Sequence, residues 1–487
     1  MRNGPRLPSL FKRASMTTTN TKLHQVTPLA GAAYALPVVP MLILMSTNNV
    51  LSGIYATHHG LALSAIATVM LIAGLFDAVT DPSIGYFSDR YHARTGSRKP
   101  FVVAGAVLLM PCAWFLLNPG EGVTITYFLV WYLLFYLAMT LFQIPHQTWG
   151  GEISPVSEEK SKVYAYRNYA GYAGMIIFAA IPLLPFSEGT KVTPDTMRTL
   201  VIVAAVLLLP TLYVMLRHAP TGAHRPDRDR VHENPFRALV AIAHNKPAMW
   251  FIVAAIAHAV AGAFYIALKF MMMESYLDMG QYYVHLLLFH LVAASLAIKP
   301  AVWVINRVGK IKAWMLGHGI SIAASLMLVL VLLNNAYSLA LFVVFNAVWA
   351  LASAVGNVAS YSLLSDISDY GTYKSGVDRS ATYFSLLSLS GKTCMALGIA
   401  ASIAIASWFG FDPKADTQVA GAYWGLTLCM CIIPILCNLV AVYCASKTAI
   451  TSRRHAAIRK RLDARAARVQ QASNNNASLA SAHPAQA

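Results

Sequence analysis

The chain has 487 residues, of which 57% are hydrophobic and only 12% are charged, and its mean hydropathy is +0.54. This apolar fraction is far above that of a soluble globular domain and argues against a soluble enzyme. The net charge of +17 would suggest a nucleic-acid partner in a soluble chain, but here the basic residues lie in a few loops and in the tails. We therefore expect an integral membrane protein without a nucleic-acid partner.

Apolar runs of about twenty residues recur along the chain, and each is long enough to cross a hydrocarbon core of about 30 Å as a helix. The predicted spans are 29–53, 61–86, 100–118, 124–149, 167–186 and 198–216, followed by 247–273, 282–306, 313–333, 337–364, 381–410 and 419–446. The sequence thus predicts an all-α membrane protein with twelve transmembrane helices in two pseudo-symmetric six-helix bundles.

The basic residues of the loops fall mainly on one side of the predicted helices, which indicates that both termini are cytoplasmic. The predicted parts are an N-terminal tail (1–26), a first bundle (27–216), a central cytoplasmic loop (217–246), a second bundle (247–446) and a basic, largely disordered tail (447–487). The segment after Lys447 has a basic, amphipathic helical character, which predicts either a solvated anchor or a helix that lies on anionic headgroups, and the Ser/Asn/Ala-rich end beyond Gln471 is expected to be disordered. We expect a monomer in a bacterial inner membrane, with Met1 or Met16 as the start.

The first acidic residues of the chain are Asp77 and Asp81, inside the apolar second span. Each costs about 2.5–3.5 kcal/mol at a helix centre, and their i, i+4 spacing puts them on one face. Two carboxylates about 6 Å apart at their Cβ atoms repel one another unless a cation lies between them or one is protonated. The pair predicts a coupling site for a cation or proton, and a structural pair bonded to Lys or Arg of other helices is the alternative.

The segment after the second span is short and basic, and it contains Gly85, Asp89, Arg90, Gly96, Arg98 and Lys99. Such a turn holds one half of a two-state transporter at the cytoplasmic side, with Asp89 capping and pairing. We expect these residues to form a conformational gate that sets the balance of states rather than the identity of the ligand.

Four stretches resemble a known family: residues 76–85 running on to Arg98-Lys99-Pro100, Gln143-Ile144-Pro145, residues 366–374, and Lys392. From about residue 30 to 445 the chain is similar to the glycoside-pentoside-hexuronide cation symporters of the major facilitator superfamily, of which the melibiose carrier is the best-studied type. The resemblance implies the major facilitator fold and secondary active transport. It implies symport of a sugar or glycoside with H⁺ or Na⁺ by alternating access.

The resemblance also implies roles for single residues. Asp77 and Asp81 match the cation-site carboxylates, Arg167 matches a substrate-site arginine, and Lys392 matches a lysine near both sites. We expect Thr80 and Gln143 as neutral oxygen ligands of the cation. We also expect Lys392 within salt-bridge reach of Asp77 and Asp81, because an unpaired ammonium in the middle of an apolar span is costly. Asp369 and Lys374 are expected in the conformational gate.

The chain departs from the melibiose carrier at the helix that contains Pro145. Gln143 replaces an aspartate of that carrier, and His146 and Gln147 replace an aromatic pair. Residues 35–37 of the first span also lack the expected sugar-binding aspartate. Galactoside recognition is therefore not carried over, and the lost carboxylate favours a proton over sodium, with both ions open.

Several polar residues of the spans have two interpretations. His146 is a substrate hydrogen-bonding group or proton relay, or else a satisfied interior histidine. Trp149 is an interface anchor or a stacking surface, and we place Gln147 with both at the substrate site. Lys269 and Lys299 are read first as lysines that extend to the membrane interface and second as ligands.

Three functions compete. Symport of a small solute, a saccharide, is the leading hypothesis; transport of a lipid-like or amphiphilic molecule and a membrane sensor without transport are the alternatives. No catalytic triad, phosphate-binding loop or Cys-His cluster occurs in the sequence. We expect no enzymatic activity, no cofactor other than the coupling ion and no structural metal.

Overall fold

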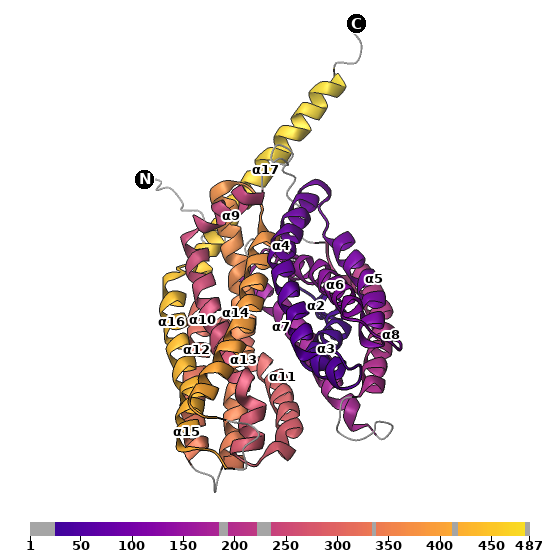
Figure 1. Cartoon of the computed structure of the whole chain (residues 1–487). Helices are drawn as coiled ribbons and strands as arrows, with labels where there is room; N and C mark the ends of the chain where they lie inside the picture. The colour runs from indigo at the N-terminus through magenta and orange to yellow at the C-terminus, as the bar shows by residue number, and fades with distance from the viewer. Residues whose placement is uncertain (1–24, 185–192, 222–234, 334–337, 412–416, 483–487) are drawn as a thin grey trace, which may run out of the picture.

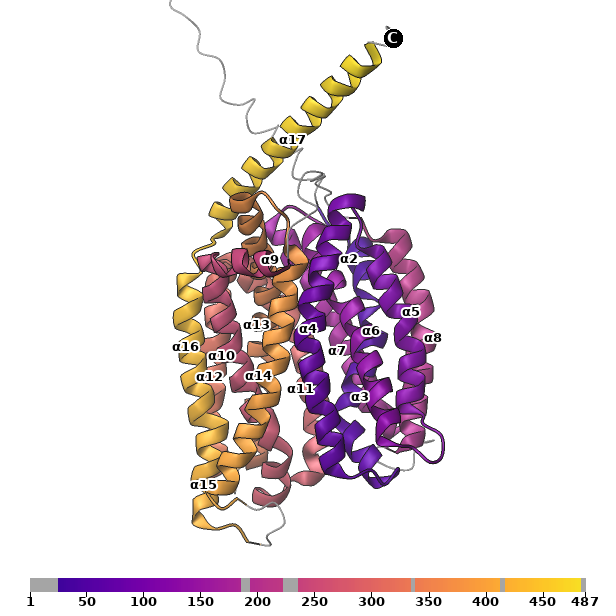
Figure 2. The same cartoon turned by 45° about the horizontal axis from the view of Figure 1, so that its top comes forward.

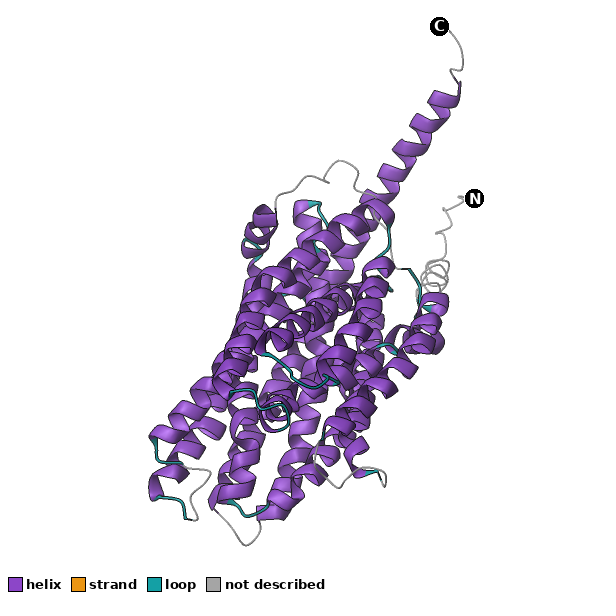
Figure 3. Cartoon of the chain, turned by 45° about the vertical axis from the view of Figure 1, so that its right-hand side comes forward, coloured by secondary structure: helices purple, strands orange, loops and turns teal. Residues whose placement is uncertain are grey.

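The computed structural model describes residues 25–184, 193–221, 235–333, 338–411 and 417–482, and every regular element in these ranges is a helix (Figures 1 and 3). The first half holds α2 (Pro28–Ala35), α3 (Val38–Thr57), α4 (Leu63–Thr95), α5 (Lys99–Leu117), α6 (Ile125–Glu152), α7 (Ser157–Ala180) and α8 (Pro194–His218). The second half holds α9 (Pro235–Ala243), α10 (Lys246–Met271), α11 (Tyr283–Val308), α12 (Lys310–Leu333), α13 (Ser338–Ser375), α14 (Ser380–Trp408), α15 (Ala420–Thr427) and α16 (Ile433–Lys447), followed by α17 (Ser452–Ala482). Most of the predicted N-terminal tail and residues 222–234 of the predicted central loop lie outside the described residues, and α9 lies in the described part of that loop.

The two halves of the chain form two helix bundles side by side (Figure 1). Each bundle has its own apolar core, with α5 packed on α6 in the first and α12 packed on α13 in the second. The bundles meet where α4 contacts α14 and where α7 contacts α11 and α13. The predicted membrane fold of two six-helix bundles is confirmed.

Eleven helical segments of the described chain are long and apolar enough to cross a membrane. The remaining predicted span corresponds to α7, whose 24 residues extend over about 36 Å. Its first half is polar, and Glu159, Lys160 and Ser161 are buried there. α7 is less apolar than the other spans because it lies between the two bundles instead of facing lipid.

Two helices extend well beyond their predicted ends. α4 continues to Thr95 and stops at Gly96, whose φ of +73° is a left-handed conformation that glycine adopts without strain. Asp89 therefore lies on α4 and not in a turn. α13 continues to Ser375, so that Asp366 and Asp369 lie one turn apart on one helix face.

The C-terminal segment is a helix over Ser452–Ala482, so the helical character of its basic start continues through the end that we expect to be disordered. Its first turns bury His455, Ile458 and Leu462, a helical i, i+3, i+7 spacing, and the remainder extends away from the bundles (Figure 2). The backbone N–H of Val26 donates to Glu159 near the start of α7, so both ends of the described chain lie at the same end of the bundles. We call this end, which carries the start of α7 and α17, the basic end.

Candidate functional site

Asp77, Asp81 and Lys392 meet between α4 of the first bundle and α14 of the second. Lys392 Nζ lies 2.9 Å from Asp77 Oδ2 and 3.0 Å from Asp81 Oδ1. One ammonium reaches both carboxylates because they stand one turn apart on the same face of α4. The ion pairs that the charges of these helices led us to expect are present, and they join the two bundles.

The third acceptor of the Lys392 ammonium comes from α6 and is Thr140, which the sequence analysis missed. Thr140 Oγ1 donates to Asp81 Oδ1 at 2.9 Å and accepts from Lys392 Nζ at 3.3 Å. The three N–H groups of the ammonium thus face three oxygens. The hydroxyl of Thr140 fixes the rotamer of Asp81 in the absence of a carboxylate on α6.

Gln143 and Thr80, the expected neutral ligands, do not contact the carboxylate pair. Gln143 lies one turn beyond Thr140 on α6, is half-buried and makes no hydrogen bond within the described part of the chain. Thr80 Oγ1 donates to the carbonyl of Phe76 in its own helix at 3.1 Å. In this conformation Thr140, and neither of the expected ligands, hydrogen-bonds the carboxylate pair.

Each carboxylate of the pair keeps one oxygen free. Asp77 Oδ1 and Asp81 Oδ2 are buried and have no hydrogen-bond partner. A buried acceptor without a partner costs about 1–3 kcal/mol, and the pair with Lys392 carries a net charge of −1. One proton or one small monovalent cation would neutralise this charge. The Lys392 side chain is 24% exposed, so the group is not sealed in the interior.

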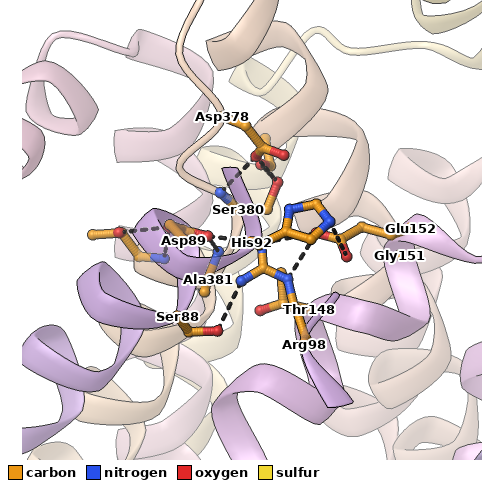
Figure 4. A network of polar contacts seen from close by, with 12 residues as sticks. Ser88, Asp89, His92, Arg98, Thr148, Gly151, Glu152, Asp378, Ser380 and Ala381 are labelled. Atoms are coloured by element: carbon orange, nitrogen blue, oxygen red, sulfur yellow. Dashed lines mark hydrogen bonds and ion pairs between the residues drawn. The ribbon is translucent and has the colours of Figure 1, made fainter. Parts of the chain in front are cut away.

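A network of buried charges joins the bundles at the basic end (Figure 4). Asp89 of α4 accepts hydrogen bonds from the backbone N–H groups of Ala381 (2.8 Å) and Thr382 (2.9 Å) and from the Thr382 hydroxyl (2.8 Å). A carboxylate at the N-terminus of α14 is stabilised by the free N–H groups and by the helix dipole. Arg98 donates to Asp89 at 2.8 Å and to Glu152 of α6 at 2.9 Å, and so orients the carboxylate from within the first bundle.

α4 and α14 approach closely at Gly85. A Cβ atom there would lie 2.8 Å from Ser385 Oγ and 3.0 Å from the carbonyl oxygen of Ala381. The absence of a side chain lets α4 reach α14 and brings Asp89 to the N-terminus of that helix. Gly85, Asp89 and Arg98 therefore lie at the bundle interface, where a gate requires them.

Asp378, in the loop between α13 and α14, adds a further carboxylate to this network. Ser380 donates to it from its backbone N–H (3.0 Å) and from its hydroxyl (2.6 Å). Burial raises the pKa of Asp378, whereas the charges of Arg98 and His92 and the Ser380 hydrogen bonds lower it. The lowering effects together are larger, so the pKa of Asp378 is below its ordinary value. His92, Glu152 and Asp378 have the spacing of metal ligands, but Arg98 already neutralises Glu152.

A second network at the basic end is built on Asp366 and Asp369 of α13. Lys160 of α7 lies 2.6 Å from Asp369 Oδ2 and 3.6 Å from Asp366 Oδ1, which links the first bundle to the second. Lys310 at the start of α12 lies 2.7 Å from Asp366 Oδ2. The expected gate residue Asp369 is thus paired across the interface.

The C-terminal helix also binds Asp369. His455 Nε2 lies 2.8 Å and Arg459 Nη1 2.9 Å from its two oxygens. Asp366, Asp369 and His455 have the spacing of metal ligands, yet three cationic side chains already surround them. Neither reading of the tail that we considered, a solvated anchor or a headgroup-binding helix, included this contact.

Two expected gate residues lie apart from these networks. Arg90 makes no ion pair or hydrogen bond with any described residue, because the next position on a helix after Asp89 points about 100° away from α14. Lys374 is exposed, and its Nζ lies 5.6 Å from the ring centroid of Tyr370. Neither residue joins the two networks in this conformation, and their role in the gate stays a prediction.

His146, Gln147 and Trp149 were expected at the substrate site but are buried in the first bundle. His146 Nε2 lies 2.8 Å from the Tyr34 carbonyl, which can only accept, and the two rings stack with centroids 4.2 Å apart. Trp149 is 1% exposed and donates to the carbonyl of Pro220, and Gln147 is 2% exposed. The contacts with Tyr34 of α2 make His146 an interior histidine in this conformation.

Arg167 of α7 is buried and makes no ion pair or hydrogen bond within the described residues. Its guanidinium carbon lies 5.2 Å from the ring centroid of Tyr361 on α13, across the interface. A buried guanidinium without a carboxylate partner is free to bind an acidic or hydroxyl-rich solute.

The residues that the sequence analysis missed are contact partners whose position depends on helix packing. They are Thr140, Lys160, Lys310, Asp366, Asp378, His455 and Arg459. Asp366 stood inside the quoted motif at 366–374, and its i, i+3 spacing to Asp369 was a usable signal. For the tail residues the usable signal was the helical spacing of their apolar neighbours.

A family model described as MFS/sugar transport protein matches residues 33–452. The uncharacterized symporter YjmB of Bacillus subtilis is 23% identical, over 79% of this chain and 83% of its own length. The sodium-dependent lysophosphatidylcholine symporter 1 of Xenopus tropicalis is 24% identical, over 77% of this chain and 78% of its own. A solved structure of a bacterial homologue of the iron transporter ferroportin in the outward-facing state has a TM-score of 0.63 at 12% identity, covers 86% of this chain and all of its own, and shows similarity of fold alone.

Proposed function

Since the chain belongs to the MFS/sugar transport protein family, we propose that it is a cation-coupled symporter that carries a sugar or glycoside by alternating access. The observation that carries this proposal is the group of Asp77, Asp81 and Lys392. It is buried, has a net charge of −1, keeps two free carboxylate oxygens, and lies between the two bundles whose relative motion drives transport. The protein is a transporter and not an enzyme.

Lys392 gives this group a means of coupling. Its ammonium occupies the position that a cation would take between the two carboxylates. A proton on one carboxylate, or a cation bound beside it, weakens these ion pairs. Lys392 is then released from α4, and the contact between α4 and α14 becomes dependent on the bound ion.

The basic end is the cytoplasmic end in this proposal, because membrane proteins retain Lys and Arg on that side of a bacterial inner membrane. The Asp89 and Asp369 networks then close the cytoplasmic side, and cation and solute enter from outside. Reporter fusions at Gly120, in the loop at the opposite end, and after Ala482 test this orientation. An external C-terminus would overturn it.

The proposed coupling ion is the proton. Sodium requires several oxygen ligands, and the α6 position that would supply a third carboxylate holds Gln143, which does not contact the pair. A proton requires one carboxylate oxygen, and two are free. Solute uptake is measured in vesicles with a sodium gradient at constant pH and with a pH gradient without sodium. Strict sodium dependence would overturn the choice of ion, and Gln143→Asp should then raise the apparent sodium affinity.

Substitutions of the pair test the function itself. Asp77→Asn and Asp81→Asn should abolish gradient-driven accumulation and leave counterflow exchange measurable, because each removes the titratable oxygen without removing volume. The matched control is Asp195→Asn, an exposed aspartate at the start of α8. If both variants accumulate solute like the wild type, the pair is structural and the proposal fails.

A lipid-like solute is the second candidate cargo, favoured by the similarity to the sodium-dependent lysophosphatidylcholine symporter. Counterflow in proteoliposomes with monosaccharides, glycosides and lysolipids separates the two. Exchange of lysolipids without exchange of any sugar would replace the proposed cargo and leave the coupling mechanism in place.

A further inference from the structure

A second group of unpaired polar side chains lies in the other bundle, away from the carboxylate pair. Its central residue is Lys269 of α10. The buried cationic side chains of the described chain are Arg98, Lys160, Arg167, Lys269, Lys310 and Arg379. Arg98, Lys160 and Lys310 pair with carboxylates and Arg379 donates to Ser375, whereas Arg167 and Lys269 have no oxygen partner among the described residues.

Lys269 does not extend to the membrane interface as we first expected. The residue is 6% exposed, and its Nζ lies 5.9, 5.8 and 5.9 Å from the ring centroids of Tyr265, Tyr283 and Trp349. These rings come from α10, α11 and α13, so three helices hold the ammonium in one place. Cation–π contacts near the 6 Å limit stabilise the charge but leave its three N–H donors without acceptors.

Two more polar side chains in this cluster also have hydrogen-bonding atoms without a partner. The Tyr265 hydroxyl is buried and has no hydrogen-bond partner, and its ring packs edge-on against Trp349 with centroids 4.1 Å apart. His290 of α11 lies 5.0 Å from Trp349, and its Nδ1 is directed at the carbonyl of Asn346, which leaves Nε2 as a free acceptor. An ammonium, a hydroxyl and an imidazole nitrogen therefore lie together beside aromatic ring faces. No carboxylate of the described residues pairs with the ammonium of Lys269.

The cluster lies in the half of the bundle remote from the basic end. Lys269 follows the start of α10 by 23 residues, about 35 Å along the helix from the basic end. Trp349 precedes Tyr361, the ring that Arg167 contacts, by 12 residues on α13, or about 18 Å. A monosaccharide is too short to contact Lys269 and Arg167 at once, so the two cations mark separate positions.

We propose that Lys269, Tyr265, Tyr283, His290 and Trp349 form an outer subsite that binds the acidic group of an anionic solute before the solute moves inward. The ammonium and the Tyr265 hydroxyl bind a carboxylate or a phosphate, and the aromatic rings contact the flat apolar face of the attached body. The inference deepens the proposed function and rests on it, since it states that the cargo carries a negative charge.

The experiment measures binding of matched ligand pairs to the purified full-length protein by calorimetry, in the absence of any gradient. D-glucuronate is compared with D-glucose, and lysophosphatidate with monoacylglycerol, so that one arm tests a sugar carboxylate and the other a lipid phosphate. The variants are Lys269→Gln and Lys269→Met, and the control is Lys299→Gln, an exposed lysine on α11. Thermal unfolding of each variant is recorded alongside.

We expect the wild type to bind one acidic ligand more tightly than its neutral counterpart. The preference should fall by roughly 10- to 100-fold in both Lys269 variants, as for loss of a charge-assisted hydrogen bond, and should be unchanged in Lys299→Gln. An unchanged preference in the Lys269 variants, with or without a lower unfolding temperature, would show that the cage is structural and overturn the inference. The absence of binding of either acidic ligand to the wild type would also overturn it.

Gradient-driven uptake in vesicles, measured beside this binding experiment, separates the inference from the proposed function. Gradient-driven uptake of neutral sugars without a preference for acids would refute the subsite and leave the symporter intact. Binding of the acid that depends on Lys269, without gradient-driven uptake of any sugar, would support the subsite and refute sugar symport.

Discussion

Replacing Asp89 by asparagine should open the basic end. The carboxylate accepts three hydrogen bonds from the first residues of α14, two of them on Oδ2 and one on Oδ1, and Oδ1 also accepts from Arg98. Asparagine has the same shape but only one acceptor oxygen. If its nitrogen takes the place of Oδ2, both bonds from Thr382 are lost; if it takes the place of Oδ1, the bonds from Ala381 and Arg98 are lost.

The variant therefore loses one or two hydrogen bonds between the bundles. Each hydrogen bond to a charged group contributes about 1.5–3 kcal/mol, so the closed basic end is destabilised by about 1.5–6 kcal/mol. This corresponds to a shift of roughly 10- to 10⁴-fold in the equilibrium between closed and open states. The population of the open state should become directly measurable.

The assay is a distance measurement by electron paramagnetic resonance between spin labels at positions 94 and 374, which are exposed at the basic end of α4 and of α13. Asp89→Asn should add or enlarge a population at longer distance. Asp195→Asn, at the opposite end of the first bundle, is the control and should reproduce the wild-type distribution. An unchanged distribution in Asp89→Asn would refute the view that these hydrogen bonds hold the gate closed.

Three further predictions concern stability and are measured by thermal unfolding in detergent. His146→Ala should lower stability by about 2–4 kcal/mol, because it removes a packed ring and a buried hydrogen bond, and it should leave solute selectivity unchanged; altered selectivity would return His146 to the substrate site. Asp378→Asn should lower stability at neutral pH and reduce the loss of stability in acid. A carboxylate with a depressed pKa stabilises the fold above its ordinary pKa and loses this contribution as the pH falls through the pKa of the folded state. An unchanged loss of stability in acid would contradict this. Lys392→Met should lower the free energy of unfolding by about 3–5 kcal/mol, because it leaves two buried carboxylates unpaired. Adding Asp81→Asn should restore part of this loss in the double variant. Additive effects of the two substitutions would contradict the ion pair.

The sequence was most informative where a residue is costly in its own right. Asp77, Asp81 and Lys392 each place a charge within an apolar run, so their need for a partner at similar depth predicted the contact that the structure contains. The helices themselves followed from run length, since a span of about twenty apolar residues has one stable conformation in lipid. Run length did not predict the polar ends of α4 and α13, because both helices continue beyond their apolar runs.

The sequence was least informative where the partner comes from another helix at an unknown rotation. Gln143 and Thr140 lie one turn apart on α6, and only the packing of α6 against α4 decides that the threonine meets Asp81. His146 was ambiguous for the same reason, since the ring of Tyr34 that covers it lies more than a hundred residues earlier in the chain. The C-terminal helix was misjudged because its polar, alanine-rich end resembles a disordered tail, whereas its binding to α13 depends on two aspartates far from it in sequence.

The partners of Asp369 belong to two bodies that separate when the basic end opens. Lys160 leaves with the first bundle, but His455 and Arg459 sit on a helix fixed to the second bundle and remain with the aspartate. Lys310 likewise remains paired with Asp366 within the second bundle, and Glu152 remains paired with Arg98 within the first bundle. Stripping a buried carboxylate of its partner would otherwise add about 3–5 kcal/mol to the open state. Under the proposed alternating access, each half therefore carries its own counter-ions, and His455 and Arg459 of the C-terminal helix keep Asp369 paired when Lys160 moves away.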